Sequence, residues 1–120
     1  MDAIGREIKP KVLNMSWILL LIAGFFEVGF TTFLKFSDSF TKPWPSIGFF
    51  ICGMISFYFL TLGMKTIPLG TAYAVWTGIG AFGTSIVGIY VFKDPTDFSR
   101  LFFLGLLIVS IIGLKFFSKT

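Results

Sequence analysis

Four long apolar runs, separated by short polar connections, constrain this chain more than any other feature. The runs cover residues 17–34, 46–64, 69–92 and 101–117. The hydrocarbon core of a bilayer is about 30 Å thick, and roughly 20 helical residues are needed to cross it. Each run is long enough to cross as a helix, and a chain of 120 residues has no room for a separate soluble domain. We predict an all-α integral membrane bundle of four transmembrane helices.

The charged residues agree with a membrane protein and exclude several other classes. Only 13% of the residues are charged, whereas soluble domains average about 25%. The net charge of +4 comes from residues in the N-terminal tail and near the ends of the apolar runs, so we expect no nucleic-acid partner. The chain has no histidine and a single cysteine, Cys52. This excludes an intrachain disulfide and a Cys-pair metal site. We predict no metal, no cofactor and no enzymatic activity.

Residues 1–14 form a polar tail, and the transmembrane domain is expected to comprise residues 15–120. A signal peptide is disfavoured because no small-residue cleavage site follows and Glu27 interrupts the apolar run. With the tail, six Lys or Arg residues fall on the side of the termini and four on the other. Without it the count is three against four, nearly no bias under the positive-inside rule. We therefore predict dual topology, with translation starting at Met15, and an antiparallel dimer.

Glu27 is the most informative residue, since it stands in the middle of an apolar run. An ionisable residue at that depth costs about 2.5–3.5 kcal/mol on insertion scales, so it needs a functional explanation. Ala23, Glu27 and Thr31 are spaced four apart and share one helix face. A carboxylate in this position can hold a proton or a cation, and each displaces the other. The alternative is a permanent bond to a Lys or a backbone donor, but no basic residue lies deep in a run.

Aromatic and hydroxyl side chains near Glu27 complete a predicted cation site. Tyr73 and Trp76 share a face with Gly80, and aromatic rings offer a π surface to a cation. The same pair would also suit an interfacial belt or core packing. Ser56 is a candidate hydrogen-bond partner of Glu27, although a lone Ser often bonds a carbonyl of its own helix.

Small residues predict close helix contacts at two places. Gly78 and Gly80 would allow a hinge for alternating access, or else tight packing without a bend. In the last run, Gly105, Ser110 and Gly113 are the predicted dimer contact. One small bundle cannot enclose much of a cavity, so an oligomer is expected.

From Met15 to Ser118 the chain resembles the small multidrug resistance family of bacterial proton-coupled exporters. The resemblance rests on four stretches: AGFFEVGFTTFLKFS, WPS, IPLGTAYAVWTGIGAFG and IIGLKFFS. It implies a homodimer or paired heterodimer in the bacterial inner membrane, in which both copies of Glu27 bind protons and substrate alternately. It also implies that Tyr73 and Trp76 line the site, that Ser56 supports Glu27, and that the fourth helix makes much of the dimer contact.

The stretches point to different branches of that family. GTAYAVWTGIGAFG looks like the guanidinium exporter branch, which usually carries Trp where this chain has Phe30. Residues 31–46 look more like the quaternary ammonium branch, and FKDPTDFSRLFF resembles a subunit of a heterodimeric exporter. Phe30 and Thr31 join the predicted binding residues. We predict proton-coupled export of guanidinium or guanidinyl compounds. The alternatives are promiscuous quaternary ammonium efflux, a heterodimer subunit, and a non-transporting packing or regulatory membrane subunit.

Overall fold

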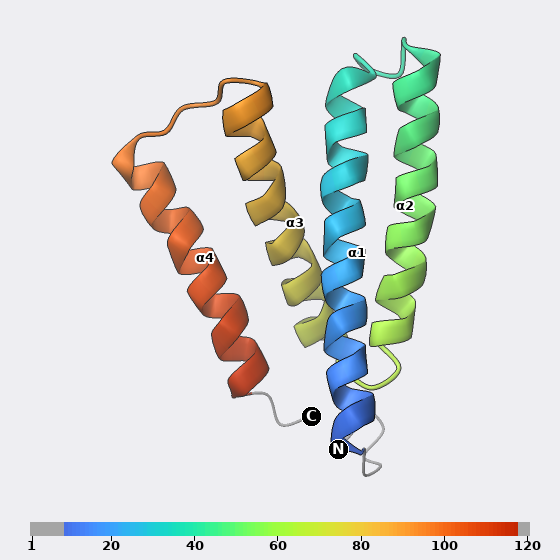
Figure 1. Cartoon of the computed structure of the whole chain (residues 1–120), viewed down its shortest axis with the longest axis vertical. Coiled ribbons are helices and arrows are strands. Elements are labelled where there is room, and N and C mark those ends of the chain that lie inside the picture. The colour runs from blue at the N-terminus through green and yellow to red at the C-terminus, as the bar shows by residue number, and fades with distance from the viewer. Residues whose placement is uncertain (1–8, 118–120) are drawn as a thin grey trace.

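A computed structural model describes residues 9–117 and contains four helices in this range (Figure 1). They are α1 (Pro10–Phe36), α2 (Pro43–Gly63), α3 (Leu69–Val91) and α4 (Phe98–Phe116). All four are long and apolar enough to cross a membrane. The predicted all-α class and the four-helix bundle are confirmed.

Helix α1 begins earlier than the sequence predicts. It starts at Pro10, seven residues before Trp17, with Lys9 in extended conformation at the N-cap. Proline is favoured in the first helical turn because its fixed φ suits the helix and its missing N–H would be unpaired there anyway. Leu13 packs against the buried core of the bundle. Residues 10–14, predicted to belong to the tail, are therefore helical, while residues 1–8 lie outside the described range.

Helices α2 and α4 also begin three residues before their predicted starts. Pro43 and Pro45 both lie in the first turn of α2, where a proline removes no intrahelical hydrogen bond. At α4, the carboxylate of Asp97 accepts a hydrogen bond of 3.3 Å from the backbone N–H of Arg100. This N-cap starts the helix at Phe98.

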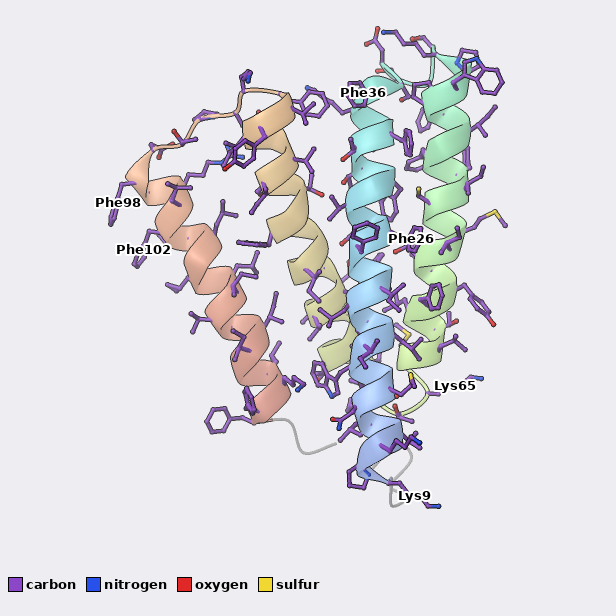
Figure 2. The ribbon with its side chains drawn as sticks, viewed as in Figure 1. Lys9, Phe26, Phe36, Lys65, Phe98 and Phe102 are labelled. Carbon is purple, nitrogen blue, oxygen red and sulfur yellow. The ribbon has the colours of Figure 1, made fainter. Side chains whose placement is uncertain are left out.

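Helix α1 lies at the centre of the fold. It packs against α2 and α3, whereas α4 contacts only α3 among the described helices (Figure 1). Leu20 and Ala23 of α1, Leu60 of α2, and Val75 and Trp76 of α3 are buried where the first three helices meet. No residue of α4 is buried, and Figure 2 shows Phe98 and Phe102 projecting from α4 away from the other helices.

The bundle is thin, with extents of 47 × 35 × 19 Å. Lys9 and the turn residue Lys65 lie at the end of the molecule where α1 begins, and Phe36 lies at the opposite end (Figure 2). Below, the end near Phe36 is called the loop end, because the α1–α2 turn and the α3–α4 connection both lie there (Figure 1).

Candidate functional site

The position of Glu27 along α1 agrees with a site deep in the membrane. Glu27 precedes Phe36, the last residue of α1, by nine residues. At 1.5 Å per residue this is about 14 Å along the helix axis, close to half of the ~30 Å hydrocarbon thickness. The side chain is partly buried. Its Oε2 atom is shielded from solvent and has no hydrogen-bond partner within residues 9–117.

Glycines of α3 let α1 approach closely enough to seat this carboxyl group. A β-carbon at Gly80 would collide with Glu27 Oε2, and one at Gly83 would collide with the side chain of Val28. Gly80 and Gly83 therefore provide the space into which two neighbouring side chains of α1 fit. The backbone of α3 at Gly80 thus lies against the carboxyl group of Glu27.

One turn further toward the loop end, the two helices are joined by hydroxyl groups. Oγ1 of Thr31 lies 2.7 Å from Oγ1 of Thr84. Glu27 and Thr31 are four residues apart on α1, and Gly80 and Thr84 are four apart on α3. The two helices run in the same direction (Figure 1). Glu27 therefore lies beside Gly80, and one turn further along both helices Thr31 lies beside Thr84.

Ser56 links all three packed helices. Its hydroxyl donates to the carbonyl oxygen of Ala23 in α1 at 2.6 Å and accepts from Trp76 Nε1 in α3 at 2.9 Å. Ser56 and Trp76 are both buried. Ser56 therefore orients the indole ring of Trp76 one turn from Glu27, and makes no hydrogen bond to Glu27 itself among the described residues.

Four aromatic rings form a continuous wall beside this network. Phe30 stacks on Phe57 with centroids 6.3 Å apart, Phe57 lies 5.3 Å from Trp76, and Trp76 lies 5.7 Å from Tyr73. The wall, made of Phe30, Phe57, Trp76 and Tyr73, draws on α1, α2 and α3. Tyr73 is exposed, while Trp76 is buried. The wall offers π surface to a cation from the buried centre of the bundle to its surface.

Gly78 and Gly80 both lie at close helix contacts. A β-carbon at Gly78 would stand 2.6 Å from Ile111 Cδ1 of α4. Gly78 thus faces α4, while Gly80 faces α1. Helix α3 runs without interruption from Leu69 to Val91 in this conformation, so the two glycines serve packing here, and their role as a hinge stays a prediction.

The predicted dimer contact lies on an open face of α4. Nothing stands within 4 Å of a β-carbon built at Gly105 or Gly113. Ser110 is exposed and bonds only Leu106 of its own helix, at 2.9 Å. Gly105 and Gly113 therefore face open space, and Ser110 makes no hydrogen bond to another described helix.

A cavity of about 590 Å³ opens between α1 and α3 at the loop end. Thr31 and Thr84 line it together with two carboxylates, Asp38 and Asp94. Asp94 pairs with Arg100 of α4 at 3.4 Å. Within residues 9–117, no group of three or more His, Cys, Asp or Glu side chains is placed to hold a metal ion.

Two residues of this region were not predicted from the sequence. Thr84 continues the four-residue spacing of Trp76 and Gly80, so it shared a visible face with them. Phe57 follows Ser56 directly, but among the 17 phenylalanines only Phe30 was predicted to bind substrate. Its contacts depend on how α2 is rotated against α3, which the sequence pattern does not specify.

Comparison with known proteins gives one consistent result. Residues 15–107 match the family model described as Small Multidrug Resistance protein. A guanidinium exporter of Salmonella typhimurium (strain LT2) is 48% identical over 101 residues, which is 84% of this chain and 96% of the relative. The guanidinium exporter of Citrobacter freundii shows the same identity and coverage. That of Yersinia pseudotuberculosis serotype I is 46% identical, over 84% of this chain and 97% of the relative.

Proposed function

The chain belongs to the Small Multidrug Resistance family, and on that premise we propose that it exports guanidinium or small guanidinyl cations in exchange for protons. Its relatives are named guanidinium exporters and match it over nearly their whole length. The four membrane-spanning helices make it a multi-pass protein of the bacterial inner membrane.

The observation that carries the proposal is the carboxyl group of Glu27. It lies near half the membrane depth, and its Oε2 atom has no hydrogen-bond partner in the described chain. A buried oxygen atom without a hydrogen-bond partner is stabilised when it binds either a proton or a cationic N–H donor. Both ligands need the same oxygen atoms, so they exclude each other. Exclusive binding at one site is the requirement for coupled exchange, with the proton gradient as the driving force.

The aromatic wall supports a flat organic cation as the substrate. A guanidinium ion can stack on a ring face while its N–H groups donate to a carboxylate. Trp76 is held in place by Ser56, so its ring is oriented before the substrate arrives. Preorganisation of this kind lowers the entropy cost of binding.

We further propose that the protein works as a dimer assembled through α4. Helix α4 contacts only α3, has no buried residue, and carries small residues on an open face. In membranes, such faces associate by close packing of small residues. An antiparallel arrangement would bring two copies of Glu27 toward one shared site.

The test is proton release by purified protein. Addition of guanidinium near neutral pH should release protons from the wild type, and Glu27→Gln should abolish both this release and transport in vesicles. Glu27→Asp, which keeps the carboxyl group, should retain part of both activities. Transport by Glu27→Gln would refute the mechanism, and a wild type that releases no protons would favour the non-transporting subunit.

Export of a wider range of organic cations is a second candidate function. It is favoured by Tyr73, the exposed end of the aromatic wall. An exposed ring can accept bulkier quaternary ammonium cations, which cannot donate hydrogen bonds. Electrical currents from vesicles challenged with guanidinium and with a bulky quaternary ammonium ion separate the two. The ion that gives a Glu27-dependent current identifies the substrate class, and a current obtained only with a second gene product would identify a heterodimer.

A further inference from the structure

The loop-end cavity is separated from Glu27 by a single turn of α1. Thr31 and Thr84 line the cavity, and Glu27 lies four residues before Thr31. One helical turn rises about 5.4 Å. Polar walls and a volume of about 590 Å³ make the cavity suitable for water. The two threonine hydroxyls are thus the polar groups between a wettable space and the acid.

The hydroxyl of Thr31 has acceptors in its own helix and a partner, Thr84, in α3. A hydroxyl has one hydrogen to donate. Thr31 Oγ1 lies 3.0 Å from the carbonyl oxygen of Glu27 and 3.1 Å from that of Val28, neither of which can donate in return. Thr31 can therefore donate to its own helix or to Thr84, and when it donates to its own helix, Thr84 donates to Thr31 across the 2.7 Å contact. In that arrangement the bonds run from the cavity wall to the main-chain oxygen of Glu27.

We propose that Thr84 and Thr31 conduct protons between the loop-end cavity and Glu27. This inference rests on the proposed function and names the residues that carry its proton step. A hydronium ion in the cavity passes a proton to Oγ1 of Thr84, which passes its own hydrogen to Oγ1 of Thr31. Thr31 then rotates its own hydrogen away from the main-chain oxygen of Glu27 and gives it up to the carboxylate, so that each hydroxyl gains one hydrogen and loses one; this last transfer requires the Glu27 side chain to turn toward Thr31. Hydronium becomes water, the carboxylate becomes a carboxylic acid, and no heavy atom is transferred.

The charges around the path are few and lie at its outer end. Asp38 of the α1–α2 turn and Asp94 of the α3–α4 connection line the cavity and attract cations to it, while Lys35 of α1 also lines it and opposes them. Arg100 of α4 is engaged by Asp94 at 3.4 Å. Helix α2 contributes no lining residue to this cavity. In an antiparallel dimer the two copies of the path would open on opposite sides of the membrane, as exchange across it requires.

The chain offers a matched control for the pair. Thr32 lines the same cavity, but its hydroxyl bonds only the carbonyl oxygen of Val28 in its own helix, at 2.7 Å. Thr→Val keeps the branched shape at either position and replaces the hydroxyl with a methyl group. Thr84→Ser keeps the hydroxyl and removes a methyl group. A contact that merely holds α1 against α3 would affect every mode of transport, whereas a proton path affects only modes that need protonation.

The experiment compares two activities in reconstituted vesicles. One is uptake of labelled guanidinium driven by a pH gradient, and the other is exchange of labelled for unlabelled guanidinium at equal pH, which needs no proton. We expect Thr84→Val to slow the first by about 100-fold or more and leave the second unchanged. Thr84→Ser should restore uptake, and Thr32→Val should match the wild type in both.

Equal slowing of both activities by Thr84→Val would overturn the proton path and assign the pair to packing or gating. Uptake by Thr84→Val at the rate of Thr32→Val would overturn it as well. A wild type that shows neither uptake nor exchange contradicts the proposed function itself. The two failures are therefore distinguishable.

Discussion

The carboxyl group of Glu27 occupies the space that a β-carbon at position 80 would fill, so the acid of α1 rests on the backbone of Gly80 in α3. This contact explains why α3 carries a glycine at that position. It also couples the acid to the packing of α1 on α3, since neither helix can move along the other without changing the surroundings of the carboxyl group.

Gly80→Ala should displace the Glu27 carboxyl group and leave the rest of α3 intact. A misplaced reacting group of this kind costs about 10- to 100-fold in rate, so guanidinium transport in vesicles should fall by that factor. Gly70→Ala is the matched control, because no atom lies within 4 Å of a β-carbon built at Gly70 of the same helix. Equal transport by the two variants would contradict the seating role of Gly80.

Ser56→Ala should destabilise the protein by leaving Trp76 Nε1 buried without an acceptor. An unsatisfied buried donor costs about 1–3 kcal/mol, measurable as the free energy of unfolding in detergent. Ser110→Ala is the control, since its hydroxyl is exposed and bonds only its own helix. In a double-mutant cycle, adding Trp76→Phe to Ser56→Ala should cost less than the two single changes summed. Additive costs would show that the bond does not hold the ring.

The apparent affinity for guanidinium should rise with pH over the range in which Glu27 gives up its proton. The sign follows from competition, because a protonated carboxyl cannot pair with the cation, and lowering the pH favours the protonated form. The dissociation constant should change by at most about tenfold per pH unit for each proton displaced. Titration calorimetry in two buffers of different ionisation enthalpy measures the number of protons released. A pH-independent affinity would exclude competition at Glu27.

Gly105→Trp should weaken the dimer without unfolding the chain. The open face of α4 has room for a large side chain in the protomer, but a closely packed partner helix would not. Cross-linking in vesicles should show a lower dimer fraction than for Gly70→Trp, which places the same side chain at an open position of α3. An unchanged dimer fraction would show that the dimer contact does not include Gly105.

The N-terminal extension should bias the orientation of the chain in the membrane. The side of the termini carries six Lys or Arg residues in the full sequence and three when translation starts at Met15. Reporters fused to the C-terminus should therefore show mainly one orientation for the full chain and two for the Met15 start. One fixed orientation from the Met15 start would count against dual topology.

The helix starts show where sequence patterns fall short. The apolar runs predicted the four helices, but three of these helices begin before the apolar run that they contain, by seven residues at α1 and by three at α2 and α4. The prolines at positions 43 and 45 act as breakers in a helix interior but suit a first turn. Whether such a proline ends one helix or begins the next depends on whether the residues that follow it pack against other helices.

The residues of the candidate site also differ in how far the sequence alone predicts them. Glu27 could be identified from the sequence alone, because one acid inside an apolar run is expensive whatever the helix packs against. The aromatic pair Tyr73 and Trp76 could be proposed from the sequence but not assigned, since such a pair also suits an interfacial belt or core packing. The partners of Ser56 could not be predicted in this way, since a serine has several possible acceptors within reach. Its bonds to Trp76 and Ala23 follow from the approach of three helices.

By itself, then, the sequence determined the membrane class and the number of helices, and it identified Glu27 as the candidate acid. These depend on hydropathy and on the cost of burying charge, which are properties of each segment alone. Only the tertiary structure decided that Gly80 seats the acid and that Thr31 meets Thr84. Those contacts depend on the register and rotation of α1 against α3, and in a bilayer this choice is made by close packing between helices because hydrophobicity favours no single register.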